Sequence, residues 1–170
     1  KIKNNKCLVG IVGIGYVGIQ LIIQFNNKRI NTIGFDKDPK KLNLLKKGES
    51  PYSYIKNENI KNVKKFSTFK SNFNSIKKCD VIIICLPTPI KKNTKPDLSN
   101  IKDSFNKISR RLKKGQLIIL QSTSYPGTTR DIIAKKIRTK FNMGYDLFLS
   151  YAPERENPGS KMKFKNVTKV

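Results

Sequence analysis

Two kinds of hydrophobic pattern follow one another along the whole chain. Short, unbroken apolar runs are typical of buried strands, and longer segments with apolar residues three and four positions apart are typical of amphipathic helices. The runs predict strands, the third of them weak, at about Cys7–Val12, Asn31–Phe35, Lys65–Thr68, Val81–Leu86, Gln116–Gln121 and Asp146–Ser150. The longer segments predict helices at about Tyr16–Asn27, Pro39–Lys47, Asn57–Lys64, Ser99–Leu112 and Thr128–Lys140.

Polar residues at the helix starts indicate where three of these helices begin. Asp38 can accept hydrogen bonds from the free N–H groups of a first turn, and Pro39 suits the first helical position. Gly48 is expected to end that helix. Ser99 is expected to cap a second helix, and Thr128–Asp131 has the spacing of a capping box that opens a third.

The apolar runs lack the alternation of strands that face water on one side. Strands buried on both faces are typical of a parallel sheet that is covered by helices. The regular succession of strands and helices then predicts a doubly wound α/β fold. We expect a Rossmann-type fold with about six mainly parallel strands, in the order 3-2-1-4-5-6, and helices on both faces of the sheet.

A glycine-rich turn, Gly13-Ile14-Gly15-Tyr16-Val17-Gly18, joins the first predicted strand to the first predicted helix. In a dinucleotide-binding fingerprint, the first glycine permits the tight turn and the second lets a pyrophosphate approach the backbone. The third allows the helix to pack closely against the strand. The helix N-terminus offers N–H groups and positive potential to the phosphates. A glycine-rich turn without a ligand, as in any strand–helix unit, is the alternative.

An acidic residue at the end of the second predicted strand strengthens the dinucleotide interpretation. Asp36 lies 18 residues beyond Gly18, where a carboxylate accepts hydrogen bonds from the adenosine ribose and repels a 2′-phosphate. This favours NAD over NADP. Lys37, Lys40 and Lys41 keep NADP as an alternative, because cations at these positions could hold its 2′-phosphate. Asp36 as a solvated turn residue is the alternative.

Three polar clusters follow later strands, at Pro87-Thr88-Pro89, Gln121-Ser122-Thr123 and Glu154-Arg155-Glu156. In an open α/β sheet the ligand lies outside the carboxyl ends of the strands, so these clusters are expected to meet at one crevice. Thr88 and Thr123 offer hydroxyls to ribose, nicotinamide or water, or are simply strand-end caps. Glu154 could act on a bound water or on a substrate hydroxyl, or is a surface carboxylate.

Four motifs follow one another along the chain: Gly-Ile-Gly-Tyr-Val-Gly (13–18), Cys-Leu-Pro-Thr-Pro (85–89), Gln-Ser-Thr-Ser-Tyr-Pro-Gly-Thr-Thr (121–129) and Tyr-Ala-Pro-Glu-Arg-Glu-Asn-Pro-Gly (151–159). In this order they resemble the motifs of the UDP-glucose/GDP-mannose dehydrogenase family. The last is most similar to the UDP-N-acetylglucosamine and UDP-N-acetylmannosamine 6-dehydrogenase branch. The resemblance implies oxidation of the C6 alcohol of a UDP-sugar to a carboxylate, with two NAD⁺ used in succession.

The resemblance also implies a role for each matching residue. Tyr16 and Val17 would line the cofactor together with the glycines, Asp36 and Lys41 would lie at the adenosine ribose, and Thr88 would contact the cofactor. Thr123 would lie by the nicotinamide and help to place a catalytic water, and Glu154 would activate that water. Arg155 and Glu156 would touch the sugar nucleotide.

The chain departs from the family in its cysteines. Family enzymes use a nucleophilic Cys and a catalytic Lys from later segments, whereas Cys7, Cys79 and Cys85 lie in or just before N-terminal strands. We therefore expect residues 1–150 to form an NAD-binding domain. Residues 151–170 would begin a substrate-contacting segment that leads to a central helix and a UDP-binding domain, which this chain lacks. The chain alone is expected not to complete the reaction, and the full-length enzyme is expected to be a homo-oligomer.

Composition adds one further question, because 36 Lys and Arg face 11 Asp and Glu, a formal net charge of +25. Such a charge is typical of proteins that bind nucleic acid, membranes or anionic ligands. It also follows from compositional drift, since Lys, Ile and Asn, which have AT-rich codons, make up 69 of 170 residues. The lysines form no block, which disfavours a basic nucleic-acid-binding module. Another NAD-dependent dehydrogenase, of the 6-phosphogluconate or hydroxyacyl type, is the second alternative.

Several classes of protein are excluded by what the sequence lacks. It contains no His and three Cys without a CxxC spacing, so no metal site is expected. No apolar run approaches the ~20 residues of a membrane span. With no signal-peptide pattern at the N-terminus, we expect a cytoplasmic protein whose partners include neither membranes nor nucleic acid.

Overall fold

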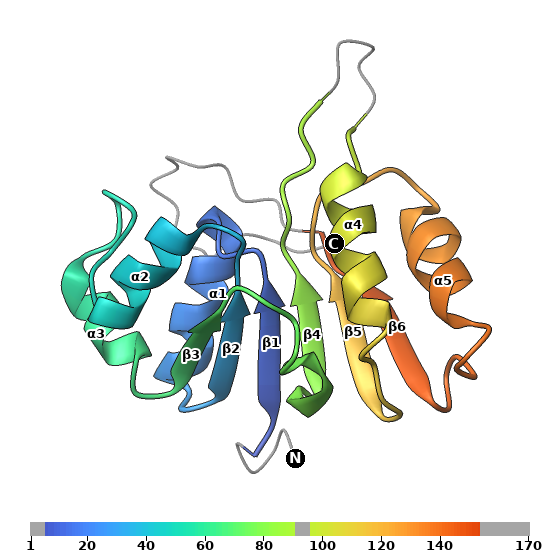
Figure 1. The fold of residues 1–170 in the computed structure, drawn as a ribbon, viewed down its shortest axis with the longest axis horizontal. Helices are drawn as coiled ribbons and strands as arrows, with labels where there is room; N and C mark the ends of the chain where they lie inside the picture. The colour runs from blue at the N-terminus through green and yellow to red at the C-terminus, as the bar shows by residue number, and fades with distance from the viewer. Residues whose placement is uncertain (1–5, 91–95, 154–170) are drawn as a thin grey trace.

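The structure is a computed structural model, and it describes residues 6–90 and 96–153. Its centre is a sheet of six strands in the order β3-β2-β1-β4-β5-β6, and each neighbouring pair is parallel (Figure 1). The strands are β1 Leu8–Val12, β2 Asn31–Phe35, β3 Ser67–Lys70, β4 Val81–Ile84, β5 Gln116–Leu120 and β6 Leu147–Tyr151. The predicted fold class and strand order are confirmed.

Helices connect the strands at the places that the apolar spacing predicts. They are α1 Tyr16–Asn27, α2 Pro39–Lys47, α3 Asn57–Val63, α4 Ser99–Ser109 and α5 Lys135–Ile137, with a π-helical segment η3 Thr129–Ala134 before α5 and a 3₁₀ turn η2 Ile76–Lys78 before β4. None of the helices in the described part of the chain is long and apolar enough to cross a membrane.

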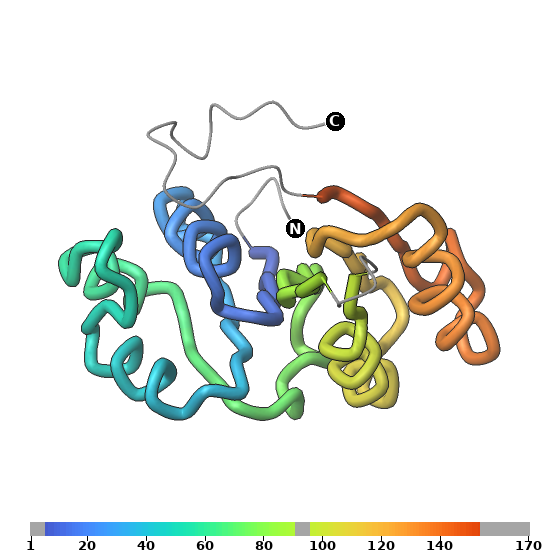
Figure 2. Tube along the Cα trace, turned by 90° about the horizontal axis from the view of Figure 1, so that it is seen from above, coloured from blue at the N-terminus to red at the C-terminus, as the bar shows by residue number. Residues whose placement is uncertain are grey.

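Helices cover both faces of the sheet, and each face has its own hydrophobic core. Side chains of α4 and α5 pack on one face, with Val12, Ile82 and Ile84 among the strand residues. Side chains of α1, α2 and α3 pack on the other face, with Ile11 and Ile83. Neighbouring residues of β1 and β4 thus face opposite cores, as expected for strands buried on both faces. Figure 2 shows α1 (blue) and α4 (yellow-green) on opposite sides of the strands.

Several element bounds differ from the predictions, as at β4, which ends at Ile84 instead of Leu86. Hydrogen bonds explain the differences at the third strand and at two helix caps. The third strand begins at Ser67 instead of Lys65, because the amides of Lys65 and Phe66 donate to Asn62 and Val63 and close the end of α3. The side chain of Ser99 makes no capping hydrogen bond; its amide donates instead to Asp97 Oδ1 (2.9 Å). The differences at β3 and at Ser99 each reflect a hydrogen bond made by a near neighbour in the sequence.

The predicted capping box at Thr128–Asp131 is also wrong. The Thr128 hydroxyl donates to the carbonyl of Tyr125 (2.8 Å), and the Asp131 carboxylate pairs with Arg130 (2.9 Å). Both side chains that the box needs are therefore engaged elsewhere. The helix there starts with π-helical turns and becomes α-helical at Lys135.

The start of α2 is as predicted. Asp38 Oδ1 accepts hydrogen bonds from the amides of Lys40 (2.9 Å) and Lys41 (3.2 Å), and Pro39 occupies the first helical position. Gly48 ends the helix in the left-handed conformation, with φ of 89°. The Asp38 cap matters for the site because it fixes the chain immediately after Asp36.

Candidate functional site

A cleft of about 790 Å³ opens at the carboxyl ends of the strands. It lies where β1 and β4 are neighbours and where the helices that follow them, α1 and α4, turn to opposite faces of the sheet. This switch point is where open α/β sheets bind ligands. The cleft is lined by most of the residues that the sequence singled out, namely Gly13, Gly15, Tyr16, Val17, Asp36, Lys41, Thr88 and Thr123. The predicted residues Glu154, Arg155 and Glu156 lie outside the described residues.

Two glycines of the turn after β1 are required by close contacts. Gly13 has φ of 91°, and a Cβ there would lie 2.7 Å from the carbonyl oxygen of Cys85. Gly18 was also predicted to bind the cofactor, but it is buried and does not line the cleft; a Cβ on it would lie 2.0 Å from the carbonyl oxygen of Gly13. Glycine at position 13 therefore allows the turn to lie against the chain after β4, and glycine at position 18 allows α1 to lie against the turn.

Gly15 is a glycine for a different reason. A Cβ built on it would meet no heavy atom within 4 Å, and the residue lines the cleft at the N-cap of α1. No side chain caps this helix, and its first turn carries no acidic residue. A pyrophosphate group can approach the backbone through such open space, and the helix N-terminus beside it offers N–H groups and positive potential. The residues present thus fit a dinucleotide cofactor.

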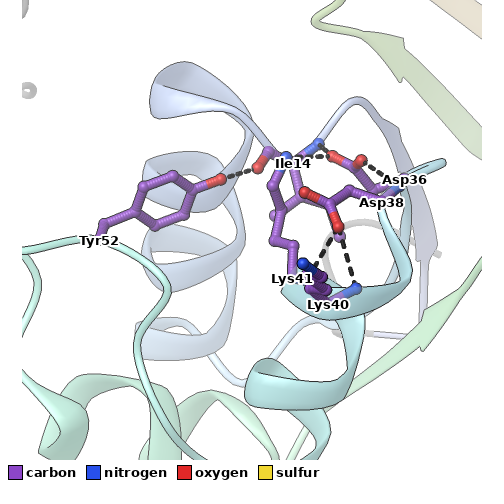
Figure 3. A network of polar contacts seen from close by, with 6 residues as sticks. All are labelled: Ile14, Asp36, Asp38, Lys40, Lys41 and Tyr52. Atoms are coloured by element: carbon purple, nitrogen blue, oxygen red, sulfur yellow. Dashed lines mark hydrogen bonds and ion pairs between the residues drawn. The ribbon is translucent and has the colours of Figure 1, made fainter.

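A polar network surrounds Asp36 at the end of β2 (Figure 3). Its Oδ2 accepts hydrogen bonds from the Ile14 amide (2.9 Å) and from Lys41 Nζ (2.9 Å), and its Oδ1 accepts one from the Asp38 amide (3.0 Å). The ion pair is well shielded, since the side chains of Lys41 and Asp36 are 20% and 10% exposed.

This environment keeps Asp36 ionised. Burial acts to raise the pKa of Asp36, but the hydrogen bonds from the Asp38 amide, Lys41 and the Ile14 amide outweigh it, and the pKa falls below its ordinary value. An ionised carboxylate has about four acceptor sites, and the three donors above leave one for a ligand hydroxyl. The charge also disfavours a phosphate at the same place.

The three lysines that could hold the phosphate of NADP, Lys37, Lys40 and Lys41, lie in different surroundings. Lys37 and Lys41 line the cleft. Lys41 Nζ donates a hydrogen bond to Asp36. Lys40 lies at the start of α2, and its backbone amide donates to Asp38. A phosphate beside Asp36 would therefore have to compete with the carboxylate for Lys41.

Several cleft residues were missed by the sequence analysis. One flank of α4, the turn that follows it and the loop after β3 contribute Ser71, Asn72, Phe73, Asn100, Asp103, Ser104, Lys107 and Arg111. The α4 members recur three and four positions apart, so they form a polar stripe on one helix face. That spacing is visible in the sequence, but it is identical to that of a solvated face.

Tyr52, in the loop between α2 and α3, was also missed. Its hydroxyl donates to the carbonyl of Ile14 inside the fingerprint turn (Figure 3). The two residues are 38 positions apart, and no periodic pattern connects them. No sequence signal could have identified this contact.

The three cysteines differ in their surroundings. Cys7 and Cys79 are buried, and burial together with Asp80 raises the pKa of the Cys79 thiol to about 12. Cys85 is half-buried and lines the cleft. Across residues 6–90 and 96–153, no group of three or more Cys, Asp or Glu side chains could hold a metal ion.

Comparisons with known proteins agree on one family. A family model described as the NAD binding domain of the UDP-glucose/GDP-mannose dehydrogenase family matches residues 7–169. The chain is 36% identical over 157 residues to a UDP-N-acetyl-D-glucosamine 6-dehydrogenase from Pseudomonas aeruginosa, covering 90% of this chain and 36% of that protein. It is 31% identical over 163 residues to a UDP-N-acetyl-D-mannosamine dehydrogenase from Methanococcus vannielii, covering 90% of this chain and 35% of that one.

A solved structure shares the fold. The UDP-N-acetyl-mannosamine dehydrogenase Cap5O from Staphylococcus aureus superposes with a TM-score of 0.82 at 28% sequence identity, covering 89% of this chain and 38% of that one. The chain thus spans little more than a third of the length of these relatives.

Proposed function

Because the chain belongs to the UDP-glucose/GDP-mannose dehydrogenase family and carries its NAD-binding domain, we propose that NAD⁺ binds in the cleft at the carboxyl edge of the sheet. The adenosine ribose would lie at Asp36, and the pyrophosphate would lie beside Gly15. The observation that carries this proposal is the pairing of an ionised, hydrogen-bonded Asp36 with open space at Gly15 in one cleft.

Other cleft residues would contact the rest of the cofactor. Tyr16 and Val17 follow Gly15 along the wall, and Lys41 holds Asp36 in place. Thr88 and Thr123 line the cleft after β4 and β5, where hydroxyls would meet the nicotinamide half. NAD⁺ supplies a hydride acceptor when it is bound. Thr123 would also hold a water near that end.

We further propose that the domain serves oxidation of a UDP-sugar at C6 to the carboxylate, with two NAD⁺ consumed per sugar. The names of the relatives, UDP-N-acetyl-D-glucosamine 6-dehydrogenase and UDP-N-acetyl-D-mannosamine dehydrogenase, support this substrate class. Residues 1–150 would bind the cofactor, and residues 151–170 would begin the substrate-contacting segment. In that segment Glu154 would activate water, and Arg155 and Glu156 would contact the sugar nucleotide. The complete enzyme would be a homo-oligomer.

A comparison of NAD⁺ and NADP⁺ binding by calorimetry tests the proposal. We expect tighter binding of NAD⁺, because the Asp36 charge repels a 2′-phosphate. Both titrations need the same ionic strength, since a net charge of +25 attracts the more anionic cofactor non-specifically. Tighter binding of NADP⁺ would assign the site to Lys37 and Lys41, and absence of binding would refute the proposal.

A further inference from the structure

The backbone of Ile14 is held from two sides by side chains that are distant in the sequence. Its N–H donates to Asp36 Oδ2 (2.9 Å), and its C=O accepts the hydroxyl of Tyr52. Figure 3 shows Tyr52 on one side of Ile14 and the start of α2, with Asp38 and Lys40, on the other side. Both backbone groups at this position are thus fixed.

The orientation of Ile14 sets the orientation of Gly15. The Ile14 C=O and the Gly15 N–H belong to one planar peptide group, and in a trans peptide they point in opposite directions. A carbonyl held toward Tyr52 therefore directs the Gly15 N–H away from Tyr52. Gly15 lines the cleft, and open space surrounds it.

We propose that Tyr52 is a positioning residue for pyrophosphate recognition, which it serves by holding the Ile14–Gly15 peptide so that the Gly15 N–H faces the phosphate position. This role rests on the proposed NAD⁺ site and adds a residue to it. Tyr52 does not line the cleft, so it would act through the backbone of the fingerprint turn.

Tyr52 is itself firmly held. Ser50 Oγ accepts a hydrogen bond from the Tyr52 amide (3.1 Å) and donates one to its carbonyl (2.8 Å). The ring of Tyr52 lies 5.3 Å from that of Tyr54, which lies 5.0 Å from the ring of Tyr16 in the cleft wall. The loop between α2 and α3 is thereby tied to the start of α1 through side chains as well as through the Ile14 carbonyl.

The hydroxyl of Tyr52 also remains a donor. Burial, and then the charges of Asp36 and Asp38, raise the pKa of Tyr52 above its ordinary value, so the group stays protonated wherever the cofactor is stable. A hydrogen bond to a peptide carbonyl polarises the N–H of the same peptide and strengthens its next bond. The contact can therefore both orient the Gly15 amide and improve it as a donor to a phosphate oxygen.

The test is the Tyr52→Phe variant, which keeps the ring and removes one hydroxyl. Binding of NAD⁺, ADP and adenosine is measured by titration. We expect NAD⁺ and ADP to bind about three- to tenfold more weakly, the range for one lost hydrogen bond. Adenosine, which lacks the pyrophosphate, should bind as it does to the unsubstituted chain. Tyr145→Phe, at an 81% exposed position, is the matched control and should change none of the three affinities.

Two results would overturn this role for Tyr52. One is an unchanged affinity of Tyr52→Phe for NAD⁺ and ADP, and the other is an equal loss for all three ligands, which indicates general damage to the site. Ser50→Ala removes the support of Tyr52 without touching its ring, and should give the same pattern of losses if Tyr52→Phe does not fold. Absence of NAD⁺ binding by the unsubstituted chain is a separate outcome, and it would overturn the proposed function together with this role.

Discussion

Asp36 combines an ion pair, two backbone hydrogen bonds and a place in the cleft wall. We expect Asp36→Asn to weaken NAD⁺ binding by ~1–3 kcal/mol, the usual scale for a hydrogen bond to a charged group. The difference in affinity between NAD⁺ and NADP⁺ should also become smaller. Calorimetry measures both. Asp146→Asn is the matched control, because Asp146 is also paired with a lysine, Lys114 (3.0 Å), but in the turn before β6. An equal loss of affinity in both variants would contradict the assignment.

The lowered pKa of Asp36 gives this residue a defined pH dependence. A carboxylate whose pKa is lower in the folded than in the unfolded chain stabilises the fold above its unfolded pKa of about 3.9. That stabilisation is lost as the pH falls through the folded value. The contribution is therefore complete at neutral pH, and acid removes it together with the Lys41 ion pair.

Gly15 and Gly18 separate the two uses of glycine in the turn. Gly15→Val puts a side chain into open cleft space, so the fold should persist by circular dichroism while NAD⁺ binding is lost. Gly18→Ala forces a Cβ to within 2.0 Å of the Gly13 carbonyl oxygen, so it should destabilise the fold itself. Unchanged NAD⁺ affinity in Gly15→Val would contradict the assignment of the pyrophosphate to the fingerprint turn.

At the scale of elements, the cap of α2 is the local signal that can be tested most directly. Asp38→Ala removes the acceptor of two first-turn amides and should lower the free energy of unfolding by about 1 kcal/mol, as for other N-cap deletions. Denaturant unfolding measures this. Ser99→Ala, at the first residue of α4, should have little effect because that hydroxyl does not cap the helix. Equal losses in the two variants would contradict the structural assignment of the caps.

The elements show what the sequence can and cannot predict. Strands and helices were predictable because burial on two faces and helical periodicity are local in the sequence. The predictions of caps at Ser99 and Thr128 were wrong because neighbouring residues make other hydrogen bonds. Asp97 accepts a hydrogen bond from the Ser99 amide, the Thr128 hydroxyl donates to the Tyr125 carbonyl, and Arg130 pairs with Asp131. The fingerprint turn was predictable from the spacing of its glycines. The hydrogen bond from Tyr52 to the Ile14 carbonyl was not, because it depends on the path of a loop without periodicity.

Charge acts at the scale of the whole molecule. Eleven acidic residues can neutralise at most a third of the 36 basic ones, so most of the cations must face solvent. Two of the ion pairs in the described residues, Lys114–Asp146 and Arg130–Asp131, lie away from the cleft and are exposed enough to contribute little to stability. The shielded pair, Lys41–Asp36, is the one in the cleft wall. The excess positive charge therefore affects the attraction of anionic ligands more than it affects the stability of the fold.

The last prediction concerns turnover by the whole chain. Hydride transfer requires the substrate carbon to be held against the nicotinamide, and such positioning can be worth ~7–11 kcal/mol. The covalent chemistry that the family resemblance implies also needs an accessible thiol. Cys7 and Cys79 are buried, burial raises the pKa of the Cys79 thiol to about 12, and Cys85 is half-buried in the cleft wall. We therefore expect the 170-residue chain to bind NAD⁺ without catalysing repeated turnover.

The measurement is NADH formation, followed by its near-ultraviolet absorbance, with UDP-N-acetylglucosamine, UDP-N-acetylmannosamine or UDP-glucose as substrate. Steady turnover with any of these sugars would contradict the prediction. It would direct attention to Cys85, the half-buried cysteine in the cleft wall. Cys85→Ser would then decide between two mechanisms, since loss of turnover with unchanged NAD⁺ affinity would make this thiol the nucleophile. Retained turnover would assign the chemistry to a group other than a cysteine thiol. Of the two remaining cysteines, Cys7 is buried in the core on the α1 face and Cys79 is buried in the core on the α4 face, beside Gly10.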